Sequence, residues 1–82
     1  MTPEEIKNTD FYKSLCTLSN TDRGKLFEMH STEVEKALGV KLIKHSYTEL
    51  GKIGTDNPII AYQDNWGSFT GPIVALMEFK PQ

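Results

Sequence analysis

A chain of 82 residues with a net charge of −2 and one cysteine has room for a single domain with one small core. The nine basic residues do not cluster as they usually do in nucleic-acid binders, so we expect no nucleic-acid partner. Cys16 is alone, which excludes an internal disulfide and a cysteine-rich zinc site. No stretch is apolar and long enough for a signal peptide or a membrane span, and we therefore expect a soluble, cytoplasmic protein.

The chain should begin with helices. Thr2 can cap a helix whose first position is Pro3, because proline fixes a helical φ and its missing N–H is not needed there. Asn8, Thr9 and Asp10 offer a second capping point, which predicts either one apolar-striped helix or a short turn followed by a helix over 10–17.

A third helical segment is expected over 22–38, with Thr21 as its cap. Ser31 marks a point where the segment either continues with a kink or starts afresh, since Thr32 and Glu35 have the spacing of a capping box. Gly39 should end this segment as a left-handed residue.

Three strands should follow. Residues 40–47 alternate imperfectly, and because neither face is cleanly apolar they suit an edge strand. Residues 58–63 and 72–79 are rich in β-branched and aromatic side chains, and the glycine-rich stretch 64–71 between them predicts a hairpin. Pro81 should end the last strand, because proline cannot donate to a sheet ladder.

These elements predict an α+β fold: one domain over 1–82, with N-terminal helices packed on a three-stranded antiparallel β-meander. In the last strand, Ile73, Ala75 and Met77 share one face, and Val74 and Leu76 share the other. Both faces are apolar, whereas so little helix can cover only one. The second face could therefore be covered by a twin subunit or by another protein.

The hairpin connection carries the candidate binding site. Trp66 and Phe69 lie on the connection, where large aromatic side chains either fold over the core or project toward a partner. Tyr62, on the preceding strand, would support them. Gly67 and Gly71 are more typical of a turn than of a phosphate-binding loop, because no lysine and no helix follow them.

Catalytic and metal-binding patterns are weak. His30 and His45 are the only histidines, neither has a second ligand at metal spacing, and both are expected to be exposed to solvent. Nothing around the serines resembles a nucleophile elbow. We expect no metal site, no cofactor and no catalytic residue.

The leading hypothesis is a small non-catalytic regulator or inhibitor that binds another protein, as a homodimer or in a heterocomplex. A phage or mobile-element factor that disables a host protein would be one example, by analogy alone. One alternative is a winged-helix nucleic-acid binder, although the presumed recognition helix over 32–38 is acidic. Another is a small enzyme that uses His30 or His45 with a neighbouring carboxylate.

Overall fold

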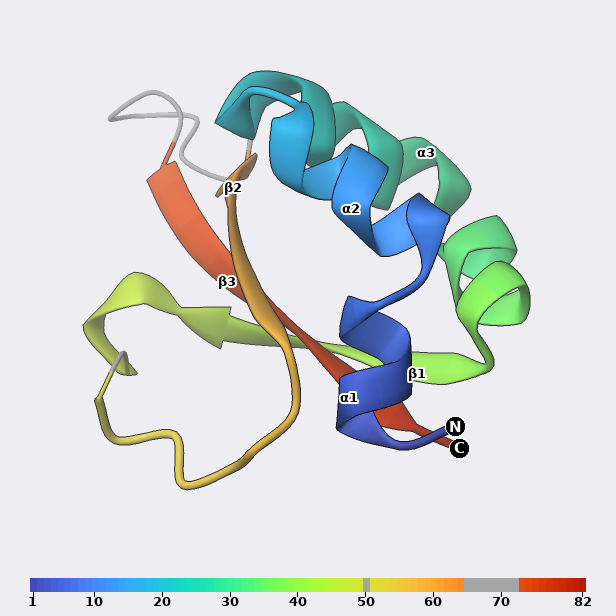
Figure 1. Ribbon diagram of the computed structural model, residues 1–82. Helices are drawn as coiled ribbons and strands as arrows, with labels where there is room; N and C mark the ends of the chain where they lie inside the picture. Colours follow the sequence, from blue (N-terminus) through green and yellow to red (C-terminus); the bar gives the residue numbers. More distant parts are fainter. Residues whose placement is uncertain (50, 65–72) are drawn as a thin grey trace.

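A computed structural model describes residues 1–49, 51–64 and 73–82, and these residues form three α-helices followed by a three-stranded antiparallel sheet (Figure 1). The helices lie together on one side of the sheet, and the two termini end side by side (Figure 1). The predicted α+β class and the order of helices before strands are confirmed.

The first two helices begin at their predicted caps. Helix α1 (Pro3–Lys7) opens with a capping box: the Glu5 N–H donates to Thr2 Oγ1 over 3.2 Å, and the Thr2 N–H donates to Glu5 Oε1 over 2.9 Å. Helix α2 (Asp10–Thr17) is capped by the Thr9 hydroxyl, which accepts from the N–H of Tyr12. The chain therefore takes the divided arrangement, because Thr9 interrupts the helical hydrogen bonds to make its own cap.

Helix α3 (Asn20–Leu38) starts earlier than predicted, because the Ser19 hydroxyl accepts from the N–H of Asp22 and serves as the cap in place of Thr21. A kink occurs at His30, whose φ of −132° is not helical, next to the predicted position at Ser31. Gly39 ends the helix at a φ of +62°, as expected. Among the described residues, no helix is both long and apolar enough to cross a membrane.

The sheet contains β1 (Val40–Ser46), β2 (Ile59–Asp64) and β3 (Ile73–Pro81), with a short 3₁₀ helix, η1 (Tyr47–Glu49), after β1. Strands β2 and β3 pair as the predicted antiparallel hairpin, and β1 lies at an edge. Strand β3 also continues to Pro81, which stands opposite Val40.

The meander, however, is wrong, because the strand order is β1-β3-β2. The last strand is inserted between the first two. A physical reason lies in burial: β3 contains five consecutive buried residues, 75–79, whereas Val40 is the one buried residue of β1 and its other positions are partly or fully exposed. The central position covers the strand that is apolar on both faces, and the mixed strand takes the edge.

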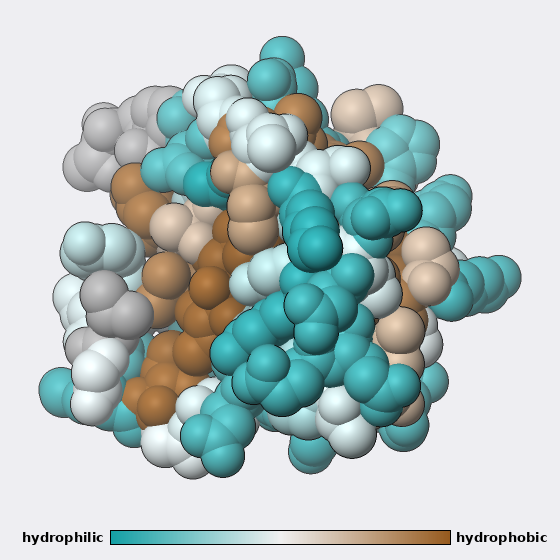
Figure 2. Space-filling view, in the orientation of Figure 1, coloured by the Kyte–Doolittle hydropathy of each residue, from teal (hydrophilic) through white to brown (hydrophobic). Residues whose placement is uncertain are grey.

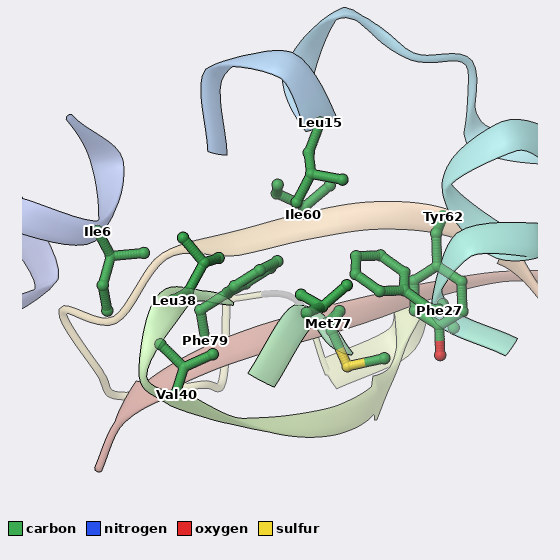
Figure 3. Packing of buried hydrophobic residues seen from close by; sticks show 11 residues of the cluster. Ile6, Leu15, Phe27, Leu38, Val40, Ile60, Tyr62, Met77 and Phe79 are labelled. Atoms are coloured by element: carbon green, nitrogen blue, oxygen red, sulfur yellow. The ribbon is translucent and has the colours of Figure 1, made fainter. Parts of the chain in front are cut away.

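The core lies between the helices and one face of the sheet. Phe79 is fully buried at its centre and makes an edge-on contact with Phe27 at a centroid distance of 5.9 Å (Figure 3). It makes a second edge-on contact with Tyr12, at 5.6 Å. The buried side chains that form this cluster are Ile6, Leu15, Phe27, Val34, Leu38, Val40, Ile60, Tyr62, Ala75, Met77 and Phe79.

The second face of the sheet carries Leu76 and Glu78, both buried. Part of the cover comes from the segment between β1 and β2, because Asn57 from this segment contacts Glu78. The chain itself thus covers part of the face for which the sequence indicated a twin subunit or a partner. Figure 2 shows hydrophobic residues gathered in a band beside the polar surface of the helices.

Candidate functional site

A polar cluster on the second face of the sheet is centred on His45. Its Nε2 atom lies 2.7 Å from Glu78 Oε1, and its Nδ1 atom lies 3.1 Å from Glu49 Oε2. The other oxygen of Glu78 accepts from Asn57 Nδ2 over 2.7 Å. The side chains of His45 and Glu78 are only 19% and 9% exposed, whereas Glu49 is half exposed.

Sheet register brings this cluster together. His45 stands opposite Leu76, so Glu78, two residues further along β3, is its diagonal neighbour on the same face. Glu49 reaches the other ring nitrogen from η1, four residues after His45. Asn57 arrives from the segment that leads into β2. The four side chains therefore come from three separate parts of the chain.

Each member of the cluster shifts the ionisation of its neighbours. The hydrogen bond to Glu78 is the main cause that raises the pKa of His45, and Glu49 adds to it against the effect of burial. The hydrogen bond from Asn57 is the main cause that lowers the pKa of Glu78, with a further contribution from His45. Both shifts favour an imidazolium paired with a carboxylate.

This geometry holds a proton more readily than it transfers one. Both nitrogens of His45 face carboxylates, so a reacting group would have to displace Glu49 to reach the ring. The expectation that His45 is exposed to solvent is wrong, because the strand places its ring between two acidic residues. His30 is exposed on α3, 3.9 Å from Glu33.

The cluster is not arranged for metal binding. Among residues 1–49, 51–64 and 73–82, no three acidic, histidine or cysteine side chains are placed to hold a metal ion together. One signal in the sequence could have located the cluster: Glu78 interrupts a strand that is otherwise apolar on both faces, and a carboxylate in such a place needs a polar partner. Asn57 had no comparable signal.

A second feature is an apolar surface at the end of the sheet next to the hairpin connection. Tyr47, Ile73 and Val74 are 53%, 46% and 41% exposed. Ser46 pairs with Ala75, so Tyr47 and Val74 follow at the same end of the sheet. We call these three residues the open-end surface; they share one end of the sheet, with Ile73 and Val74 on opposite faces of β3. Beside it, Lys44 Nζ lies 2.8 Å from Asp64 Oδ2 in an ion pair that bridges the two edge strands.

The predicted binding residues separate into two groups. Tyr62 is buried in the core, where its ring packs edge-on against Phe27 at a centroid distance of 5.1 Å (Figure 3). Trp66 and Phe69 lie outside the described residues; in the sequence they belong to the connection from Asp64 to Ile73. The sequence predicts surplus apolar surface on the last strand, but it does not single out Tyr47, Ile73 or Val74 as contact residues.

A pocket of about 400 Å³ lies between α3 and the adjoining end of the sheet. Its size is within the range of small-ligand sites. Two of its polar groups already have partners, since Asp64 binds Lys44 and Gln63 accepts from the Thr21 hydroxyl. The pocket thus indicates no particular ligand chemistry. Its lining residues are Gly24, Phe27, Glu28, Lys44, Tyr62, Gln63, Asp64 and Met77.

Comparisons with known proteins add no functional assignment. The chain matches no family model, and no curated protein or solved structure is similar enough to count as a match. Any function must therefore be argued from the residues themselves.

Proposed function

We propose that this protein is a small non-catalytic regulator or inhibitor that binds another protein through the open-end surface. The observation that carries the proposal is the exposure of Tyr47, Ile73 and Val74 at one end of the sheet. Apolar and aromatic side chains left exposed at one end of a sheet are typical of protein contacts, where their burial drives association.

The surroundings of this surface support the same proposal. The ion pair between Lys44 and Asp64 would supply a polar rim beside an apolar centre, which is the usual arrangement in an interface. Trp66 and Phe69 remain predicted contacts, because the connection that carries them joins the two strands at this end. The partner is another protein, or a second copy of this chain.

A binding comparison tests the proposal. The wild-type chain and an Ile73→Ser/Val74→Ser variant would be immobilised and exposed to lysate of the native host, with bound proteins identified by mass spectrometry. Met29→Ser is the matched control, because Met29 is an exposed apolar residue that lies on α3 and not on the sheet. A Trp66→Ala/Phe69→Ala variant tests the predicted aromatic contacts separately. Circular dichroism and thermal unfolding would verify that each variant is folded.

We expect a stoichiometric partner that the wild type and Met29→Ser retain and that the sheet-end variant loses. Sedimentation of the purified chain distinguishes a second copy from a different protein. Equal retention by the wild type and the folded sheet-end variant would rule out the open-end surface as the contact, and the absence of any bound protein or self-association would count against the binding role itself.

Two finer points stay predictions from the size of the chain. One is that binding regulates or inhibits the partner, and the other is an origin in a phage or mobile element. The cytoplasm is the proposed location, and a free, exposed Cys16 fits a reducing compartment.

A further inference from the structure

The segment between β1 and β2 is attached to the sheet at its two ends. We call this segment the strap; its described residues are 47–49 and 51–58. Near its start, Glu49 contacts His45 on β1, and near its end, Asn57 contacts Glu78 on β3. Because His45 and Glu78 also contact each other, the side-chain contacts at the two ends of the strap meet at one pair of side chains.

The middle of the strap stands away from the sheet. A hollow of about 380 Å³ separates it from His45, and most strap residues are exposed. Few apolar contacts hold a segment of this kind, so polar contacts at its ends determine whether it stays in place. The residues around the hollow are His45, Glu49, Lys52, Ile53, Gly54 and Thr55.

The two ends are not held equally. At the far end, Pro58 is buried and its carbonyl accepts from the Phe79 N–H over 2.9 Å, in addition to the contact between Asn57 and Glu78. None of these far-end bonds requires a protonated imidazole. At the near end, the half-exposed Glu49 depends on the Nδ1 atom of His45.

We propose that the strap is a pH-sensitive flap, whose Glu49 end is released from the sheet when His45 loses its second ring proton while the Asn57 end stays attached. Release widens the hollow and gives solvent access to the part of the second sheet face around Leu76 and His45. This surface is distinct from the open-end surface, so the inference does not rest on the proposed function.

The chemistry of the ring sets the direction of the change. A neutral imidazole has one N–H, and the buried Glu78 takes it at 2.7 Å. The bare Nδ1 lone pair then faces the carboxylate of Glu49 and repels it. The other charged groups near the ring are Lys52 on the strap, and Lys44 and Asp64, which line a shallow hollow with His45 on the opposite side.

The ordinary pKa of histidine is 6.5, and the two carboxylates raise the pKa of His45 above this value. The Glu49 contact is therefore fully present below about pH 6.5 and disappears as the pH rises through the raised pKa. Acid has the opposite effect on the far end, because protonation of Glu78 weakens its bonds to His45 and Asn57.

Limited proteolysis measures the release, because Lys52 is exposed on the strap and is a trypsin site. Cleavage after Lys52 would be followed between about pH 7 and pH 9 and normalised to trypsin activity on a small substrate. We expect normalised cleavage to rise with pH, by at most about tenfold per pH unit, because one proton controls release. NMR titration of the His45 ring should give the same midpoint as the amide signals of residues 47–49.

Glu49→Gln is the key variant, because Glu49 is exposed and its replacement should not prevent folding. In this variant we expect faster cleavage at neutral pH and little further change with pH. Glu33→Gln is the matched control, since Glu33 is an exposed carboxylate beside the other histidine, His30. The proposal is overturned if wild-type cleavage after Lys52 does not change with pH, or if Glu49→Gln retains the wild-type pH dependence.

Discussion

Gly24 on α3 lies directly against the carbonyl oxygen of Gln63 on β2. A Cβ atom at position 24 would come within 1.9 Å of that oxygen, which is far inside any normal contact distance. The obstacle is backbone, so no side-chain rotation can relieve the clash. Helix α3 therefore depends on a glycine to approach the edge of the sheet at this depth.

We predict that Gly24→Ala destabilises the protein, even though alanine is the better helix former by about 1 kcal/mol. The helix would have to move away from β2, and overpacking of this kind costs about 1 to 3 kcal/mol. Gly54→Ala is the matched control, because a Cβ there meets nothing within 4 Å and the backbone does not have a left-handed φ. Denaturant unfolding measures both variants, and equal stability of Gly24→Ala and the wild type would contradict the close approach.

Arg23 joins three elements at the same junction. Its Nε donates to the carbonyl of Ala61 on β2 over 2.7 Å. One terminal nitrogen donates to the carbonyls of Leu15 and Leu18 at the end of α2, over 3.1 and 2.5 Å, and the other donates to Asn20. The planar guanidinium thus bonds two carbonyl oxygens at the end of α2, and the carbonyl of Leu15 also accepts from the Leu18 N–H over 3.2 Å.

Arg23→Lys should lower the free energy of unfolding by about 1 to 3 kcal/mol, because an ammonium keeps the charge but cannot span these acceptors in one plane. Lys25→Gln, at an exposed position two residues along the same helix, controls for a general effect of charge on α3. Thermal unfolding compares the two variants. If Arg23→Lys matched the wild type, charge rather than the fork of donors would hold the junction.

The sequence predicted the elements better than their arrangement. The helix boundaries were predictable at Thr2, Thr9 and Gly39. A capping residue bonds backbone groups only a few positions away, so its effect can be read from the local sequence. The β2–β3 hairpin was predictable because its two strands are neighbours in the sequence. The pairing of β1 with β3 was not, because it joins residues between 29 and 41 positions apart in the sequence.

The difference between local and long-range contacts also explains how the sequence treated His45 and Tyr62. His45 was visible as a titratable residue, but its partner Glu78 lies 33 positions away and became its neighbour only through the register of β1 and β3. Tyr62 was assigned to a contact role because aromatic residues are common in interfaces. Alternation along β2 instead turns its ring toward Phe27 in the core.

Tyr62 should control stability in alkali. Burial is the main cause that raises the pKa of Tyr62 from 10 to about 12, and the charge of Asp64 adds to it. Because the folded-state pKa is raised, the stabilising effect is complete below about pH 10, the unfolded value, and is lost as the pH rises toward 12.

We therefore expect the free energy of unfolding to fall between about pH 10 and pH 12 in the wild type and to fall less in Tyr62→Phe. Tyr47→Phe is the matched control at an exposed tyrosine. Spectrophotometric titration should show late ionisation of Tyr62 and also of Tyr12, because burial raises the pKa of Tyr12 as well. In Tyr62→Phe the contribution of Tyr62 should be missing. An unchanged late titration in that variant would assign the buried hydroxyl to another residue.

Asn57 should control stability in acid. Its hydrogen bond is the main cause that lowers the pKa of Glu78 below 4.5, so the ionised carboxylate stabilises the fold above about pH 4.5 and this stabilisation is lost as the pH falls through the lowered pKa. Glu5 acts in the same direction, because the Thr2 N–H lowers the pKa of that carboxyl.

Asn57→Ala removes only the contribution at Glu78. In denaturant unfolding, we expect this variant to be less stable than the wild type at neutral pH, by about 1 to 3 kcal/mol, since a mostly buried carboxylate loses a donor. The difference from the wild type should shrink as the pH falls below about 4.5, where protonation weakens the same bond in both proteins. Thr2→Ala, which disrupts the capping box around Glu5, is the control for acid effects from α1. A constant difference between Asn57→Ala and the wild type across the acid range would mean that Asn57 stabilises the fold independently of the charge on Glu78.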